Sequence, residues 1–90
     1  MLKAAIIGSG FIGDTHASAY KNIEDVELVA IADINEETGK KAAEKYGVRY
    51  YQDAEVMLKT EQIDIVDVCL PTFLHEKFVL MAAQFKKHVL

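Results

Sequence analysis

Ala4-Ala5-Ile6-Ile7-Gly8-Ser9-Gly10-Phe11-Ile12-Gly13 is the segment that decides the fold. In it an apolar run breaks into a glycine turn and then resumes with helical spacing, which predicts a strand, a tight loop and a helix. In the pattern G-x-G-x-x-G, Gly8 makes the tight turn. Gly10 allows the loop backbone to approach a pyrophosphate, and Gly13 lets the helix lie close to its strand.

The start of the predicted helix has the properties of an anion site. The first backbone N–H groups of a helix, here those of Phe11 and Ile12, have no partner within the helix. They also carry a partial positive charge, so two phosphates are stabilised there without lysine or arginine. The segment therefore predicts a dinucleotide-binding loop, while a purely structural strand-to-helix turn remains the alternative.

Asp33 lies twenty residues beyond Gly13, at the end of a second apolar run. A carboxylate at this position can accept hydrogen bonds from both ribose hydroxyls of an adenosine. It would repel a 2′-phosphate, and the following Ile34 and Asn35 supply no arginine to offset that charge. We therefore expect NAD rather than NADP. The alternative, that Asp33 caps the turn into the next helix, is compatible with this role.

Composition narrows the class of protein. The chain has 90 residues, of which 51% are hydrophobic, and a formal net charge of −4, so we expect a soluble globular domain without the basic face of a nucleic-acid reader. The single cysteine, Cys69, offers no disulfide framework and suits a reducing compartment. The apolar run at the N-terminus is too short for a signal peptide or a membrane span, so we expect a cytoplasmic protein.

Strands and helices alternate along the chain. This order predicts an α/β fold with a doubly wound, Rossmann-type parallel sheet. It is incomplete on its C-terminal side, because such domains generally have six strands. We expect residues 1–90 to be the front part of a dinucleotide-binding domain in a longer protein. The expected strands are 3–7, 26–32, 48–51, 63–70 and one opening at 88–90; the expected helices are 11–20, 36–46, a brief one after Asp53, and 73–85.

A second cluster, Leu70-Pro71-Thr72-Phe73-Leu74-His75, follows the fourth predicted strand. Ligands of open α/β sheets bind at the carboxyl edge where the strand order reverses, so this cluster should face the glycine loop. Pro71 ends the strand because it cannot donate to the ladder, and Thr72 is placed to cap the following helix and still meet a cofactor. His75 is either a cofactor-side residue or an ordinary helix histidine.

Three further polar residues call for an interpretation. His16 is expected to pack between helix and sheet with its nitrogens hydrogen-bonded, and Cys69 to be a small buried hydrophobic residue. By strand alternation Asp67 lies on a helix-covered face, where a carboxylate needs a partner that the sequence does not identify. No spacing of His, Cys, Asp and Glu predicts a metal site, and no Ser/His/acid set predicts nucleophilic catalysis.

These motifs together resemble the N-terminal domain of the glucose–fructose oxidoreductase and inositol 2-dehydrogenase (Gfo/Idh/MocA) family. The resemblance covers essentially the whole chain, and its most particular elements are the extension of the glycine motif to His16 and the Pro-Thr-x-x-His element that ends at His75. The cofactor contacts expected from the motif and from the resemblance are Gly8, Ser9, Gly10, Phe11, Ile12, Gly13, Asp33, Leu70, Pro71, Thr72 and His75.

The resemblance implies a two-domain oxidoreductase that transfers hydride between a nicotinamide and a hydroxyl carbon of a sugar, inositol or related polyol. The catalytic lysine and histidine of the family belong to segments beyond Leu90, so we expect these 90 residues to be inactive alone and the whole protein to be a homo-oligomer. The alternatives are a non-catalytic NAD-sensing regulatory domain, which would share the glycine loop and the acid, and a scaffold whose glycine turn binds nothing.

Overall fold

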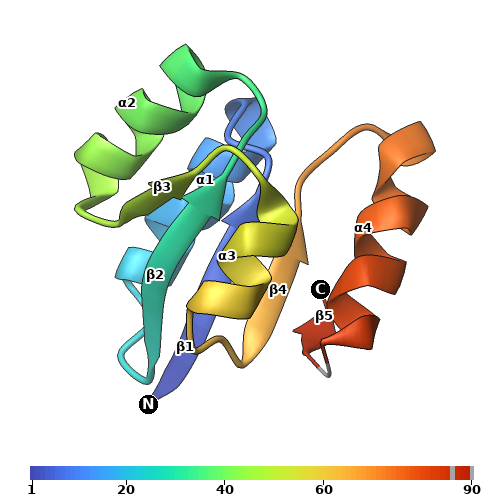
Figure 1. Ribbon diagram of the computed structural model, residues 1–90. Coiled ribbons are helices and arrows are strands. Elements are labelled where there is room, and N and C mark those ends of the chain that lie inside the picture. The colour runs from blue at the N-terminus through green and yellow to red at the C-terminus, as the bar shows by residue number, and fades with distance from the viewer. Residues whose placement is uncertain (86, 90) are drawn as a thin grey trace.

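The computed structural model describes residues 1–85 and 87–89, apart from the side chains of Thr72 and Phe73. Strands and helices alternate along this part of the chain (Figure 1). The strands are β1 (Leu2–Ile7), β2 (Val26–Ala32), β3 (Arg49–Tyr51), β4 (Ile65–Val68) and β5 (His88–Val89). The helices are α1 (Phe11–Lys21), α2 (Glu36–Tyr46), α3 (Ala54–Thr60) and α4 (Thr72–Gln84).

The five strands form one sheet in the order β3-β2-β1-β4-β5, and every pair is parallel. The chain moves outward from β1 in one direction, then crosses over through α3 to β4 on the other side of β1. Helices α1 and α2 cover one face of the sheet and α3 and α4 the other (Figure 1). This arrangement confirms the predicted doubly wound fold, with its switch point between β1 and β4.

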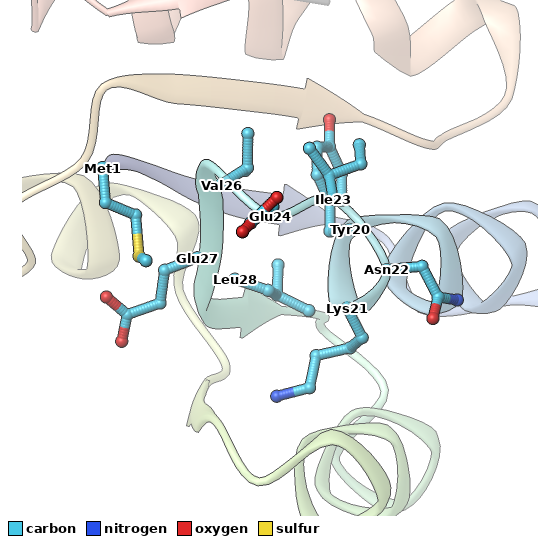
Figure 2. A pocket seen from close by; sticks show the side chains of 9 residues that line it. All are labelled: Met1, Tyr20, Lys21, Asn22, Ile23, Glu24, Val26, Glu27 and Leu28. Carbon is cyan, nitrogen blue, oxygen red and sulfur yellow. The ribbon is translucent and has the colours of Figure 1, made fainter.

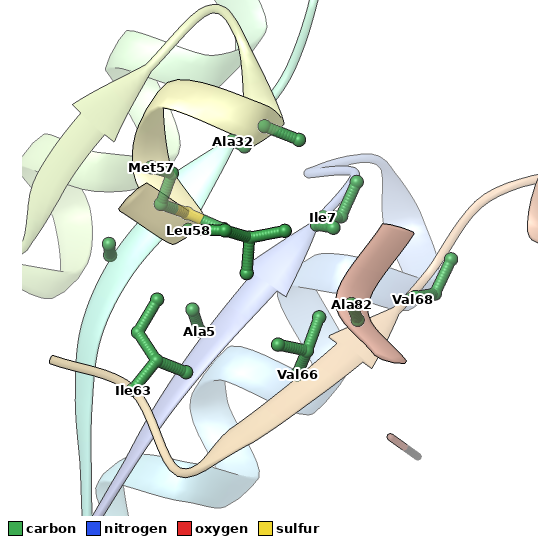
Figure 3. Close-up of a cluster of buried hydrophobic side chains, with 11 residues drawn as sticks. Ala5, Ile7, Ala32, Met57, Leu58, Ile63, Val66, Val68 and Ala82 are labelled. Atoms are coloured by element: carbon green, nitrogen blue, oxygen red, sulfur yellow. The ribbon is translucent and has the colours of Figure 1, made fainter. Parts of the chain in front are cut away.

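Each face of the sheet has its own apolar core. On the face covered by α3 and α4, Met57 and Leu58 pack against Ala5, Ile7 and strand β4 (Figure 3). On the other face, Ala17 and Tyr20 of α1 pack in one cluster with Ala4 and Ile6 of β1 and with Leu28 and Ile31 of β2. Because both faces are covered, the central strands are apolar on both sides, which explains their continuous hydrophobic sequences.

Strand β2 contains a β-bulge. Ala4 of β1 pairs with Leu28, but the next residue, Ala5, pairs with Ala30, so that Val29 is an extra residue in the ladder. Val29 and Ala30 therefore contribute to the same face of the sheet, whereas Leu28 contributes to the opposite one.

Several expected boundaries were wrong by one to two residues. The backbone N–H of Val48 completes the end of α2 by donating to Ala43, so β3 begins at Arg49. Strand β4 is shorter than expected, covering only Ile65–Val68. At α4, Pro71 and not Thr72 occupies the N-cap position.

The start of α4 follows from the backbone. The carbonyl of Pro71 accepts the first helical hydrogen bonds, from the N–H groups of Leu74 at 2.9 Å and His75 at 3.1 Å. Thr72 is therefore already the first helical residue, and its side chain lies outside the part that the structure describes. Along the described residues, no helix is sufficiently long and apolar to cross a lipid bilayer.

Met57 tests the packing of the core between α3 and the sheet. Its side chain is fully buried, whereas the preceding Val56 on the same helix is 47% exposed. We expect Met57→Ala to lower the free energy of unfolding by about 3 kcal/mol because it leaves a cavity. Val56→Ala should change it by about 0.5 kcal/mol or less. Urea unfolding of both variants checks this, and equal losses would contradict the assigned orientation of α3.

Candidate functional site

The three glycines of the loop after β1 have different surroundings. Gly8 has a φ of +99°, and a Cβ added to it would lie 2.5 Å from the carbonyl oxygen of Cys69. A Cβ on Gly13 would lie 2.1 Å from the carbonyl oxygen of Gly8. Around Gly10, by contrast, an added Cβ would meet nothing within 4 Å. Gly8 and Gly13 are thus required by the fold, while the space at Gly10 is available to a ligand.

The N-terminus of α1 is open to an anion. Gly10 occupies the N-cap position and provides no side-chain acceptor for the first N–H groups. Phe11 is 88% exposed and Ile12 is 58% exposed, so neither is covered by the described part of the chain. Unpaired N–H groups and the positive end of the helix dipole fit a phosphate group.

Asp33 ties the end of β2 to the glycine loop. Its Oδ2 accepts hydrogen bonds from the backbone N–H of Ser9 at 2.9 Å and from the Ser9 hydroxyl at 2.5 Å. Its Oδ1 accepts from the backbone N–H of Asn35 at 2.8 Å. A carboxylate accepts about four hydrogen bonds, so about one acceptor position remains. The expected contact with both ribose hydroxyls would therefore require one of these bonds to be given up.

A cleft of about 520 Å³ opens at the carboxyl edge of the sheet, beside this carboxylate. It brings together the ends of β1, β2 and β4, as the switch-point rule predicts. Of the residues expected to contact a cofactor, it contains Gly8, Asp33 and Leu70. The lining residues are Ile7, Gly8, Ala32, Asp33, Ile34, Gln52, Asp53, Ala54, Leu70, Leu74, Lys77, Phe78 and Met81.

Several residues of this cleft were not predicted as site residues, although the sequence contained a signal for them. Leu74, Lys77, Phe78 and Met81 follow helical spacing on one face of α4. Gln52 and Asp53 follow the edge strand β3, whose carboxyl end lies at the same edge of the sheet. Pro71 and the half-buried His75 do not line the cleft, so their predicted role stays a prediction.

A second hollow, of about 390 Å³, lies on the other side of the loop, between α1 and α2. It contains the predicted site residues Ser9, Gly10 and Phe11. On its wall, Asp14 accepts hydrogen bonds from the Tyr46 hydroxyl at 2.6 Å and from Lys45 at 2.9 Å, and these bonds lower the pKa of its carboxyl. They link the first turn of α1 to the last turn of α2.

The partner of Asp67 is a polar cluster beneath the loop. His16 Nδ1 lies 2.6 Å from Asp67 Oδ2, and the Tyr20 hydroxyl donates to the same oxygen at 3.0 Å. The Cys69 thiol donates to Asp67 Oδ1 at 3.4 Å. Burial, together with the charge of Asp67, raises the pKa of this thiol to about 12 and also raises the pKa of Tyr20. The predicted hydrogen bonding of His16 is thus confirmed at Nδ1, although its side chain is 44% exposed.

A further hollow, of about 550 Å³, lies at the amino ends of β1 and β2, at the opposite edge from the glycine loop. Figure 2 shows that its polar side chains do not converge, since Glu27 and Asn22 point away from each other. The Tyr20 hydroxyl is engaged by Asp67. The arrangement at this edge therefore offers no set of groups directed at one ligand.

Residues 2–90 match an oxidoreductase family described by its NAD-binding Rossmann fold, the Gfo/Idh/MocA family. The chain belongs to this family. It is 40% identical over 91 residues to the D-glucoside 3-dehydrogenase of Escherichia coli, covering 99% of this chain and 26% of that protein. It is 37% identical over 89 residues to the myo-inositol 2-dehydrogenase of Thermotoga maritima, covering 98% of this chain and 27% of the relative.

The fold is shared with solved structures of the same kind. A crystal structure of an oxidoreductase from Agrobacterium radiobacter in complex with NAD+, L-tartaric acid and magnesium superimposes with a TM-score of 0.93 at 30% identity. The match covers 98% of this chain and 26% of that one. The chain thus spans about a quarter of the length of the proteins it matches, and within it lies an NAD-binding Rossmann fold.

The surroundings of the glycines predict opposite outcomes for two alanine variants. Gly13→Ala forces a Cβ against the Gly8 carbonyl and should lower the free energy of unfolding by about 3 kcal/mol. Gly10→Ala is the matched control, because its Cβ meets nothing within 4 Å, and it should change stability by about 0.5 kcal/mol or less. Thermal unfolding measures both, and a stable Gly13→Ala variant would refute the close contact.

Proposed function

We propose that this chain is the dinucleotide-binding domain of a dehydrogenase that transfers hydride between NAD and a hydroxyl carbon of a sugar, inositol or related polyol. The observation that carries the proposal is the open N-terminus of α1 beside Gly10, with Asp33 at the same edge of the sheet. The N-terminus of a helix stabilises phosphates, and a carboxylate at the position of Asp33 accepts a hydrogen bond from a ribose hydroxyl.

The residues present fit the cofactor. The free space at Gly10 admits a group as large as a phosphate close to the backbone. The cleft beside Asp33 has the apolar walls that an adenine requires, provided by Ile34, Leu70 and Leu74. NAD, when bound, supplies the hydride acceptor. The chain's own residues hold and orient it, and we assign no catalytic residue within these 90 positions.

The preference for NAD over NADP rests on the carboxylate of Asp33. A 2′-phosphate placed near it would meet a negative charge that is held in position by Ser9 and Asn35. Lys77 lies in the lining of the same cleft and is a cation within reach of its contents. We propose that the fixed carboxylate dominates, because it lies directly at the end of β2, where a ribose binds in this fold.

The remainder of the proposed enzyme provides the substrate site. Two of the relatives act, by their names, on a D-glucoside and on myo-inositol, which are both polyhydroxylated substrates. A dehydrogenase needs a positioned alcohol and a proton acceptor in addition to its cofactor. We propose that a second domain of the longer protein supplies both, and that the whole protein is a homo-oligomer.

The activity is tested with the longer protein that contains this chain. We expect NAD-dependent oxidation of at least one member of a panel of sugars and inositols, measured by absorbance of NADH. Gly10→Val should abolish it, because the side chain fills the space kept for a phosphate, while circular dichroism stays unchanged. NADH binding without any turnover across the panel would instead favour a regulatory nucleotide sensor.

Asp33 is tested by two variants that separate its two roles. Asp33→Asn keeps the shape of the side chain but removes its charge and one of its two accepting oxygens, so we expect NADH affinity to fall by about tenfold and the ratio of NADH to NADPH affinity to narrow. Ser9→Ala removes the hydroxyl bond to Asp33 without changing the charge. Ser9→Ala should weaken the binding of NADH and of NADPH to the same extent. Fluorescence titration with NADH and NADPH measures the ratio, and an unchanged ratio in Asp33→Asn would refute the role in selectivity.

A further inference from the structure

Three side chains from distant parts of the sequence meet between α1 and β4. His16 lies in the second turn of α1, Asp67 in β4, and Cys69 directly after β4. One potential ligand atom from each of the three lies within 4.8 Å of the others. Imidazole nitrogen, thiolate sulfur and carboxylate oxygen are the ligand types that Zn²⁺ takes in proteins.

We propose that His16, Asp67 and Cys69 form a Zn²⁺ site with three protein ligands. This proposal is independent of the cofactor site, since none of the three lines the cleft beside Asp33. The ion would join helix α1 to strand β4 below the glycine loop.

The spacing of the ligand atoms supports this geometry. The Cys69 Sγ lies 3.4 Å from His16 Nδ1 and 3.4 Å from Asp67 Oδ1. Bonds of about 2.0 Å to nitrogen or oxygen and about 2.3 Å to sulfur in a tetrahedral site place neighbouring ligand atoms about 3.5 Å apart. Two edges of such a tetrahedron are therefore already formed. The third requires the hydrogen bond between His16 Nδ1 and Asp67 Oδ2, now 2.6 Å long, to give way to the ion.

The surroundings provide a supporting bond and a route for entry. Tyr20 donates to Asp67 Oδ2 and fixes the plane of the carboxylate. Asp67 Oδ1, which accepts from the Cys69 thiol, becomes the ligand atom when that thiol loses its proton. The side chain of Asp67 is only 7% exposed, whereas that of His16 is 44% exposed. The ion can thus enter past His16, and water can occupy the fourth position.

Binding requires a defined movement of protons. The Cys69 thiol gives its proton to solvent, because the thiolate is the ligand. His16 binds through Nδ1, so it gives up the Nδ1 hydrogen bond to Asp67 Oδ2, and the proton of its neutral ring moves to Nε2 through solvent. Asp67 binds as the carboxylate. One thiolate and one carboxylate neutralise the two positive charges of the ion, so the filled site carries no net charge.

Cobalt titration of the chain tests the proposal, because Co²⁺ occupies zinc sites and reports a sulfur ligand through a thiolate-to-cobalt charge-transfer band in the near ultraviolet. We expect the band to appear at one equivalent of Co²⁺ and to disappear on addition of Zn²⁺. Cys69→Ser should abolish the band, and His16→Gln should remove it or reduce the affinity at least tenfold. His88→Gln is the matched control, because His88 is an exposed histidine in β5.

Tyr20→Phe separates the metal site from a requirement for folding. It keeps all three ligands and removes only the hydroxyl that supports Asp67, so we expect weaker Co²⁺ binding by about tenfold. Zn²⁺ should also raise the midpoint of thermal unfolding of the unmodified chain but not that of Cys69→Ser. A Co²⁺ spectrum without a charge-transfer band, or one that persists in folded Cys69→Ser, would overturn the proposal.

Discussion

The close contact between the glycine loop and the start of α1 is the constraint on which the rest of the structure depends. Gly13 approaches the carbonyl of Gly8 so closely that no side chain fits between them. Gly8 in turn lies against the carbonyl of Cys69 at the end of β4. Backbone therefore packs on backbone at the switch point between β1 and β4, where the strand order reverses. This contact fixes the N-terminus of α1 at the carboxyl end of β1.

Asp33 connects this loop to the neighbouring strand. Its carboxylate accepts hydrogen bonds from the backbone N–H and the hydroxyl of Ser9 and from the backbone N–H of Asn35. One carboxylate therefore holds the glycine loop, the end of β2 and the start of α2 together. The same group provides a negative charge at the carboxyl edge of the sheet. The structural role of Asp33 and its proposed role in recognition thus fall on one side chain.

The fold and the glycine loop were predictable because their signals are local. Alternating strands and helices, the glycine spacing and the capping side chains of Asn35 and Asp53, which accept from backbone N–H groups at the starts of α2 and α3, each involve residues near each other in sequence. The partner of Asp67 was not predictable, because His16 is 51 residues away and reaches it only once α1 covers β4. The prediction that Thr72 is the N-cap of α4 was wrong, because the carbonyl of Pro71 already accepts the first hydrogen bonds of the helix.

The extra residue in β2 governs which way the end of that strand faces. From Ala30 onward the alternation of side chains is reversed relative to an unbroken strand, so that Ile31 joins the core beneath α1 and α2. If the strand continued past Leu28 in regular alternation without a bulge, Ala30 and Ala32 would face α1 and α2, and Ile31 would face α3 and α4. The bulge thus assigns the large Ile31 to the core covered by α1 and α2, and the small Ala30 and Ala32 to the core covered by α3 and α4.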